Sequence, residues 1–294
     1  MTKKKSVGSI DIVSYFIVTI FALICLIPFL YIASASISDE NILIQEGYRM
    51  IPKQISIRAY EIVLGGAQIW DSYKVSIFTT LMGTFLSLVF SSMIAYPLST
   101  KRLKYGAAIN FYVYFTMLFT GGLVPTYILI SRYLKMTNTI WVLIIPTLII
   151  PWNMFLLRNF YASIPASLAE SAKIDGANDF VILVRIILPC SKPALATVGL
   201  FYALGYWNEW FKAMLYNSGE KTTWPLQYLI MQIIRKAETI TNMAAQGIDV
   251  SAASMPSSTM KMATAICTIG PIIFAYPFVQ RYFTGGIMVG SVKG

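Results

Sequence analysis

Long apolar stretches recur along the chain and form its main pattern. Six of them have the length that a membrane-spanning helix needs, about 20 residues. They lie near 12-33, 75-98, 107-131, 139-157, 193-211 and 262-280. None alternates polar and apolar residues as a barrel strand does, and a helix satisfies its own backbone groups in lipid. The pattern predicts an all-α membrane protein in which residues 1-294 form a single domain of six transmembrane helices.

Composition narrows the possible functions of such a protein. Charged residues make up 12% of the chain, whereas an ordinary soluble domain has about 25%. The absence of histidine excludes imidazole metal sites and acid/base chemistry that depends on histidine. The three cysteines, Cys25, Cys190 and Cys267, share no short spacing and are predicted to be packing residues. We therefore expect no catalytic residue, no metal site and no enzymatic activity in this chain.

Basic residues beside the apolar stretches predict the orientation of the helices. The net charge of +10 comes from residues spread along the chain, so nucleic acid is not an expected partner. Lysine and arginine cluster at 3-5 and at 101-104, and such clusters mark cytoplasmic flanks. We expect a multi-pass protein of the cell membrane with both termini in the cytoplasm. Long external loops then lie near 34-74 and 212-261.

Proline and glycine interrupt three of the predicted spans. They stand at Gly121, Gly122 and Pro125, at Pro146 and Pro151, and at Gly270, Pro271 and Pro277. Membrane helices tolerate such breaks where neighbouring groups or cavity water satisfy the freed backbone. Either the breaks shape a translocation cavity and its gate, or they are ordinary kinks and close contacts. The sequence favours neither interpretation.

The segment 163-189, between the fourth and fifth spans, is too polar to cross a membrane. We predict two short helices joined by a turn. Ser163 or Ser167 would cap the first helix, and Glu170 would complete a capping box with Ser167. Gly176 would end this helix in the left-handed conformation.

The second helix of this segment would be capped by Asn178 and would stop at Pro189. Small residues, Ala169 and Ala172, lie on the first helix. We therefore expect an exposed cytoplasmic elbow that is suited to docking into a groove of a partner.

This elbow resembles the EAA loop of ATP-binding-cassette (ABC) importer permeases, whose pattern is E-A-A, three residues, G, nine residues and I-x-L-P. The matching positions are Glu170, Ala172, Gly176, Ile186, Leu188 and Pro189. Ser171 departs from the pattern where the second alanine would stand. The resemblance implies that the loop couples the chain to an ATPase through Glu170, Ser171, Ala172, Asp175, Gly176, Ala177, Leu188 and Pro189.

Similarity to this family extends along nearly the whole chain. Arg158-Asn159-Phe160, the cluster from Trp207 to Phe211 and the tail from Gln280 resemble the second permease of carbohydrate importers, in the branch for oligosaccharides and polysaccharide-derived sugars. The resemblance implies four kinds of partner: a homologous permease, a pair of ABC ATPases, an extracytoplasmic sugar-binding protein and a carbohydrate. ATP and Mg²⁺ would be held by the ATPases, and this chain would bind no cofactor. It contains no P-loop, which agrees with that implication.

Aromatic and polar side chains gather near the external end of the fifth span. Tyr202, Tyr206, Asn208 and Glu209 combine ring faces with hydrogen-bonding groups, as sugar sites do. We predict that these residues line the substrate cavity. The alternative is an interfacial belt that anchors the helix.

Two other functions stay open. One is an ABC permease for another solute, such as a peptide or an amino acid, and the other is a stand-alone channel or scaffold. The spans contain almost no ionisable groups, which argues against a proton- or sodium-coupled carrier. By resemblance, the loop 212-261 would probe the sugar cleft of the binding protein.

Overall fold

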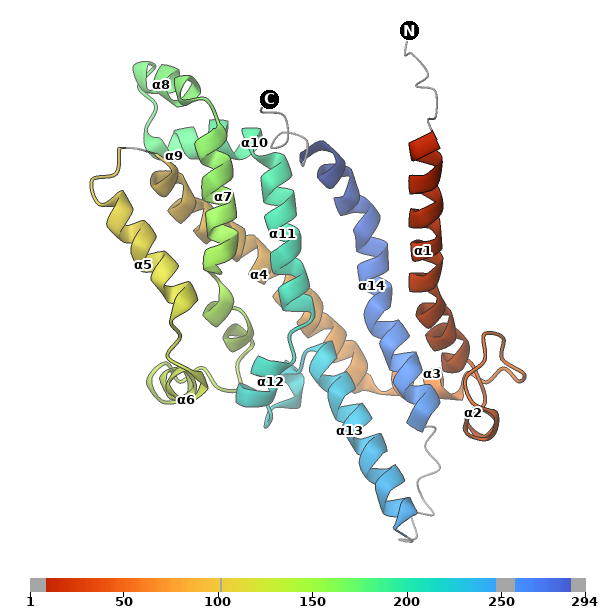
Figure 1. Ribbon diagram of the computed structural model, residues 1–294. Helices are drawn as coiled ribbons and strands as arrows, with labels where there is room; N and C mark the ends of the chain where they lie inside the picture. The colour runs from red at the N-terminus through yellow and green to blue at the C-terminus, as the bar shows by residue number, and fades with distance from the viewer. Residues whose placement is uncertain (1–8, 101, 247–256, 287–294) are drawn as a thin grey trace. The chain divides into compact units, whose positions relative to one another are not determined.

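The computed structural model describes residues 9–100, 102–246 and 257–286. Within these residues the chain is helical, and extended residues pair only at an isolated antiparallel bridge between Ser38 and Ile55. The predicted all-α class is therefore confirmed for the described part (Figure 1). The α-helices are α1 (Ser9–Ser36), α2 (Glu40–Glu46), α3 (Arg58–Gly65), α4 (Ala67–Ser99), α5 (Gly106–Leu118), α6 (Leu123–Ile128), α7 (Pro151–Ser163), α8 (Ala166–Ile174), α9 (Asp179–Ile182), α10 (Leu188–Cys190), α11 (Lys192–Trp207), α12 (Phe211–Tyr216), α13 (Leu226–Ala245) and α14 (Ser257–Gly286). Shorter π and 3-10 turns are η1 (Leu129–Tyr133), η2 (Ile140–Leu143), η3 (Ile145–Thr147), η4 (Leu183–Ile187) and η5 (Lys221–Thr223).

Two of the described helices are each long and apolar enough to cross a membrane unbroken, Ile12–Ser36 and Ala67–Ser99. Three bent pairs of helices pass the same test and would raise the number among the described residues to five. Their bends are 108° between α5 and the α6–η1 segment, 50° between the η2–η3 segment and α7, and 87° between the α9–α10 segment and α11. The sixth predicted stretch, 262-280, lies within α14.

Glycine and proline explain the breaks in the third and fourth predicted spans. Gly122 has a φ of 88°, a left-handed conformation that glycine adopts without strain, and it separates α5 from α6. Pro151 begins α7, and Ile150 before it is extended, as the residue before a proline prefers. By contrast, α14 continues through Pro271 and Pro277.

The chain is divided into two compact units, of which the first comprises residues 1–67 and 232–271. Its polar contacts join segments that are distant in the sequence. The Glu40 carboxylate accepts hydrogen bonds from the backbone N–H groups of Ser258 (2.8 Å) and Thr259 (2.7 Å), at the start of α14. The Tyr60 hydroxyl donates to Ser36 Oγ over 2.9 Å.

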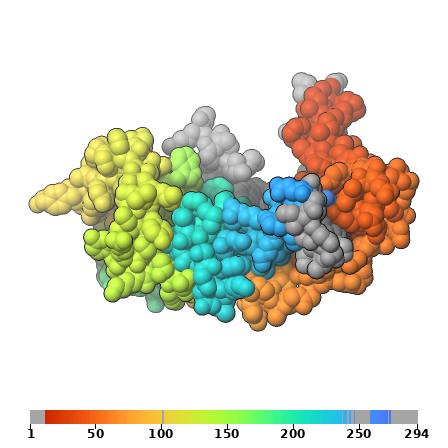
Figure 2. Space-filling model, turned by 90° about the horizontal axis from the view of Figure 1, so that it is seen from below, coloured from red at the N-terminus to blue at the C-terminus, as the bar shows by residue number. Residues whose placement is uncertain are grey.

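The second unit comprises residues 68–231 and 272–294 and holds both candidate site regions. Its core is formed by α4, α7 and α11, with Leu157, Tyr161, Val198 and Tyr202 among the buried side chains. The helices α8, α9 and α10 lie at one end of α7 and α11 (Figure 1). At the opposite end, the Asn138 N–H donates to the Tyr216 carbonyl over 2.9 Å, so the chain before η2 lies beside α12 (Figure 2).

Candidate functional site

The elbow, residues 163–189, begins differently from the prediction. Pro165 occupies the cap position of α8, and no side-chain oxygen caps this helix. The predicted caps by Ser163 and Ser167 are therefore wrong, and so is the capping box with Glu170. The physical reason is that α8 already begins at Ala166, so Ser167 lies inside the helix, and the proline at the cap position has no side-chain oxygen to accept a bond. The Ser163 hydroxyl donates instead to the Phe160 carbonyl over 2.7 Å.

The turn of the elbow follows the prediction closely. Gly176 has a φ of 82°, and its N–H donates to the Lys173 carbonyl over 3.0 Å. The Ala177 N–H reaches back to the Ala172 carbonyl over 2.9 Å. These two bonds form a Schellman motif, which requires a left-handed residue at the position of Gly176. The left-handed glycine is confirmed.

The second half of the elbow starts as predicted and ends later. The Asn178 side chain accepts a hydrogen bond from the Val181 N–H over 2.9 Å, so the predicted cap is confirmed. The predicted stop at Pro189 is wrong, because α10 runs to Cys190 and the bend comes at Ser191. Pro189 is the second residue of α10, which continues directly from the π turn η4.

Ion pairs at the elbow are exposed. Lys173 Nζ lies 2.7 Å from an Asp179 carboxylate oxygen, and Arg102 from the loop after α4 lies 3.4 Å from Glu170. The side chains of Arg102 and Glu170 are both 58% exposed, so this pair contributes little to stability. A hollow of about 680 Å³ is lined by these side chains and by the adjoining ends of α4, α7 and α9. The elbow is therefore only partly packed on its own bundle.

The candidate coupling residues divide between the surface and this packing. Glu170, Ser171, Asp175, Gly176 and Pro189 are exposed. Three others are half-buried and pack against the core of the unit: Ala172, Ala177 and Leu188. The sequence interpretation assigned the small residues to a partner's groove, whereas Ala169 and Ala172 contact the chain's own core.

Large apolar side chains of the elbow are exposed, and the sequence alone did not single them out. Ile174, the last residue of α8, is 87% exposed, and Phe180 and Leu168 are also exposed. Exposed apolar clusters of this kind mark protein contacts. An isoleucine directly before a predicted turn was the signal that could have revealed the patch.

The second candidate region lies where α4 and α11 cross in the core. Tyr202 and Tyr206 stand four residues apart on α11 and are buried. Their hydroxyls pair with Ser91 Oγ (2.7 Å) and Ser87 Oγ (2.9 Å), which stand four residues apart on α4. The equal spacing lets two successive turns of one helix bond two turns of the other.

The same hydroxyls satisfy backbone groups of the broken fourth span. Pro151 keeps Ile150 out of the helix, and the Ile150 N–H donates to the Tyr202 hydroxyl over 3.0 Å. The Tyr206 hydroxyl donates to the Ile144 carbonyl over 3.2 Å. Both tyrosine hydroxyls therefore have partners within the chain.

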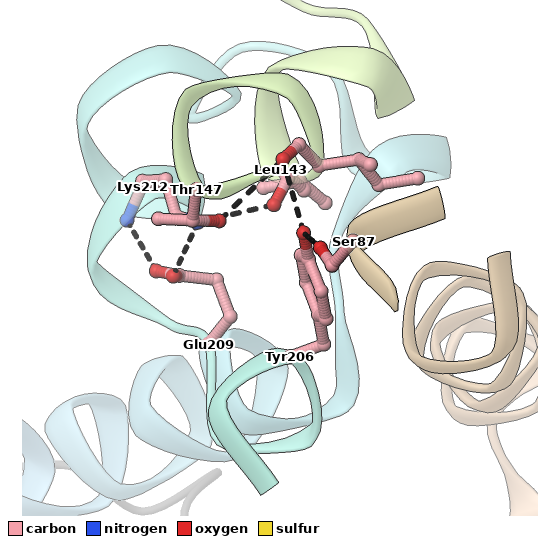
Figure 3. Close-up of polar contacts among 7 residues, drawn as sticks. Ser87, Leu143, Thr147, Tyr206, Glu209 and Lys212 are labelled. Carbon is pink, nitrogen blue, oxygen red and sulfur yellow. Dashed lines mark hydrogen bonds and ion pairs between the residues drawn. The ribbon is translucent and has the colours of Figure 1, made fainter. Parts of the chain in front are cut away.

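An ion pair that is largely buried completes this region (Figure 3). Lys212 Nζ lies 2.8 Å from a Glu209 carboxylate oxygen, and the two side chains are 12% and 16% exposed. The ammonium also donates to the Leu143 carbonyl (3.0 Å) and to Thr147 Oγ1 (2.9 Å). In a 3-10 turn the Leu143 carbonyl would bond the N–H of residue 146, but that residue is a proline, so the lysine supplies the missing donor.

Of the four predicted cavity residues, the structure leaves one exposed. The Asn208 side chain is at the surface, where its Nδ2 donates to the Leu204 carbonyl and its Oδ1 accepts from Gln227 Nε2. Contact of Tyr202, Tyr206, Asn208 or Glu209 with a sugar stays a prediction. We shall call the residues Ser87, Ser91, Leu143, Ile144, Thr147, Ile150, Tyr202, Tyr206, Glu209 and Lys212 the polar network.

Helices with lipid-length apolar stretches, together with an exposed polar elbow at one end of the second unit, define a helical membrane protein. No family model matches the chain. It is 40% identical to the polygalacturonan/rhamnogalacturonan transport system permease protein YtcP of Bacillus subtilis (strain 168), over 97% of this chain and 98% of that protein. It is 39% identical to protein LplC of the same strain, over 92% of this chain and 90% of LplC.

A solved structure gives the same result. The crystal structure of a bacterial ABC transporter involved in the import of the acidic polysaccharide alginate includes a chain that matches with a TM-score of 0.80 and 34% identity. The match covers 96% of this chain and 99% of that one. The present chain belongs to the permease subunits of ABC transport systems for carbohydrates.

Proposed function

We propose that this permease carries oligosaccharides derived from acidic polysaccharides, whose sugar units bear carboxylates. The single observation that carries the proposal is the 40% identity to a polygalacturonan/rhamnogalacturonan permease over nearly the full length of both chains. The likeness to a transporter chain for alginate, another acidic polysaccharide, points to the same chemical class.

In this proposal the chain crosses the membrane six times, with α14 as the sixth span and both termini in the cytoplasm. The clusters of basic residues at 3-5 and 101-104 support the orientation. Cysteine labelling from outside, in a background without the three native cysteines, should then reach position 45 and miss positions 5, 104 and 290. Labelling of position 104 from outside would contradict the orientation.

The elbow is proposed to dock on one subunit of an ABC ATPase pair. Its exposed carboxylate, Glu170, and its exposed apolar side chains, above all Ile174, give a partner both charge and apolar area to bind. The Schellman turn at Gly176 fixes the direction in which α8 projects. ATP and Mg²⁺ belong to the ATPases, and a homologous permease and an external sugar-binding protein complete the transporter.

Transport then needs no bond chemistry in this chain. Closure of the ATPases would move the elbow and switch the permease pair between inward- and outward-facing states. Asn208 remains the best candidate for a direct sugar contact, since its side chain is exposed near the end of α11. Glu209 is close to it but is held by Lys212.

The proposal is tested by measuring ATP hydrolysis of the purified complex in lipid nanodiscs. This complex consists of the two permeases and the pair of ATPases. Binding protein is added that has been mixed with a uronate oligosaccharide, with a neutral oligosaccharide of equal length, or with a peptide. We expect stimulation by the uronate sugar alone. Equal stimulation by the neutral sugar would contradict the acidic substrate class, and stimulation by the peptide would contradict a carbohydrate substrate.

A further inference from the structure

The polar network joins two helices that both leave the elbow. Helix α7 enters the elbow at Ser163, and α11 leaves it at Lys192. Between the elbow and the network these helices share a buried core, to which Leu157 and Val198 contribute. At the end of α7 remote from the elbow, the Ile150 N–H donates to Tyr202 on α11. The two helices are thus tied along their shared length and can move as one pair.

The chain immediately beyond this tie is not a continuous helix. Residues 144–150 contain the 3-10 turn η3 and lead into α7, and the η2–η3 segment meets α7 at a bend of 50°. Three backbone groups around the bend bond to side chains outside it: Leu143 O to Lys212, Ile144 O to Tyr206 and Ile150 N to Tyr202. Non-helical backbone at membrane depth persists only where such partners exist.

From this arrangement we infer that residues 144–150 are a hinge of the transport cycle, and that Tyr202, Tyr206 and Lys212 are the positioning residues that hold it. Movement of the elbow passes along the α7 and α11 pair and is taken up at the bend, at the end of the unit remote from the ATPase. The inference rests on the proposed function, because only a coupled transporter has such a movement.

Side-chain bonds are suited to a hinge for a physical reason. A continuous helix closes one backbone bond per residue and resists bending, whereas here a few hydroxyl and ammonium groups fix the angle. The hydroxyls of Ser87 and Ser91 on α4 bond the same two tyrosines. The angle of the bend is therefore set relative to α4, a helix outside the moving pair. Hinges are commonly formed by a few residues at the ends of elements, as in this segment.

Hydrogen–deuterium exchange of the assembled wild-type complex tests the hinge directly. Exchange over residues 144–150 is compared between the nucleotide-free complex and the complex trapped with ATP. We expect this segment to change its exchange between the two states, while the middle parts of α4 and α11 do not. Equal exchange of the segment in both states would overturn the inference, whatever any variant does.

Variants then test the positioning residues by sugar uptake per ATP hydrolysed. Tyr202→Phe and Tyr206→Phe keep the ring and remove one hydroxyl each. Losing one such hydrogen bond changes the ratio of the correctly bent to the wrongly bent conformation by about fivefold. We therefore expect uptake per ATP to fall by about that factor. Tyr133→Phe is the matched control, because Tyr133 is 77% exposed and should transport normally.

The outcomes separate this inference from the proposed function. If the wild-type complex takes up no sugar, the proposed function fails. If it takes up sugar and both variants keep the wild-type uptake per ATP in intact complexes, only the positioning role fails. If a variant does not assemble, the exchange measurement on the wild type still decides whether 144–150 is a hinge.

Discussion

The aromatic ring of Tyr206 lies directly against the backbone of Gly83. A Cβ built at Gly83 would stand 2.7 Å from Cε2 and Cζ of that ring, closer than real Cβ atoms come to such neighbours. The two helices α4 and α11 therefore approach each other at this point because position 83 has no side chain. The approach brings the Tyr206 hydroxyl within bonding distance of Ser87 Oγ, one turn further along α4.

Substitution of Gly83 by alanine should push the two helices apart. Tyr206 is 3% exposed and its hydroxyl is bonded, so the ring cannot move aside freely. We expect a loss of about 1–3 kcal/mol in stability, the usual cost of overpacking. Thermal unfolding of the purified complex measures it. Gly205→Ala on α11 is the control and should lose no stability, because nothing lies within 4 Å of its added methyl group and alanine is a better helix former than glycine.

Removal of the Lys212 charge should be more damaging than removal of the whole ion pair. Lys212→Met leaves the largely buried Glu209 carboxylate without a counter-charge, with only the backbone N–H of residue 212 still bonded to it, and such a loss costs about 3–5 kcal/mol. The double variant Lys212→Met with Glu209→Gln removes that charge but still leaves the Leu143 carbonyl without its donor, at about 1–3 kcal/mol.

Thermal unfolding of both variants in nanodiscs should therefore give intermediate stability for the double variant. Full recovery of wild-type stability in the double variant would show that Lys212 serves only to neutralise Glu209. Equal loss in both variants would show that its bond to the backbone accounts for the whole effect.

The turn at Gly176 should tolerate asparagine and reject valine. A β-branched residue at a φ of 82° strains the backbone by about 1–3 kcal/mol, whereas asparagine enters this region more readily. The space around Gly176 is open, so sterics with neighbours play no part. We expect Gly176→Val to reach the membrane normally and to lose sugar-stimulated ATP hydrolysis, and Gly176→Asn to keep most of it. Loss in both variants would point to a requirement other than the left-handed turn.

The role of Glu170 should lie outside this chain. Its contact with Arg102 is exposed at both ends, so Arg102→Ala should change stability by less than about 1 kcal/mol and should leave stimulated hydrolysis intact. Glu170→Lys reverses a charge that we assign to the ATPase contact, and it should release or loosen the ATPase subunits. Co-purification of the ATPase with each variant checks this pair. Equal loss of ATPase from both variants would instead make the Arg102 contact the essential one.

Local backbone rules made part of the elbow predictable from sequence. A glycine between two helical patterns predicts a left-handed turn, and an asparagine two residues later predicts a cap, so Gly176 and Asn178 were assigned correctly. The same rules failed at Ser163 and Ser167. There Pro165 takes the cap position, and several candidate caps within a few residues leave the choice to tertiary packing.

Long-range contacts account for what could not be predicted. The partners of Tyr202 and Tyr206 include Ser91 and Ser87, which lie more than 100 residues earlier in the chain. From sequence alone, two tyrosines beside an amide and a carboxylate are typical of a sugar site, and nothing local shows that their hydroxyls are already bonded. Similarly, Lys212 follows an apolar stretch, as flanking cations of membrane spans do. Only the fold shows that it donates to the Leu143 carbonyl, which Pro146 leaves without a backbone donor.

ATP-driven uptake decides whether this chain is a coupled permease for acidic oligosaccharides. Proteoliposomes holding the assembled wild-type or Gly176→Val complex are loaded with ATP on the cytoplasmic side and given labelled uronate oligosaccharide with binding protein outside. We expect the wild type to accumulate the sugar only when ATP is present, and Gly176→Val to accumulate none. Uptake that is independent of ATP, or equal in both complexes, would contradict this expectation.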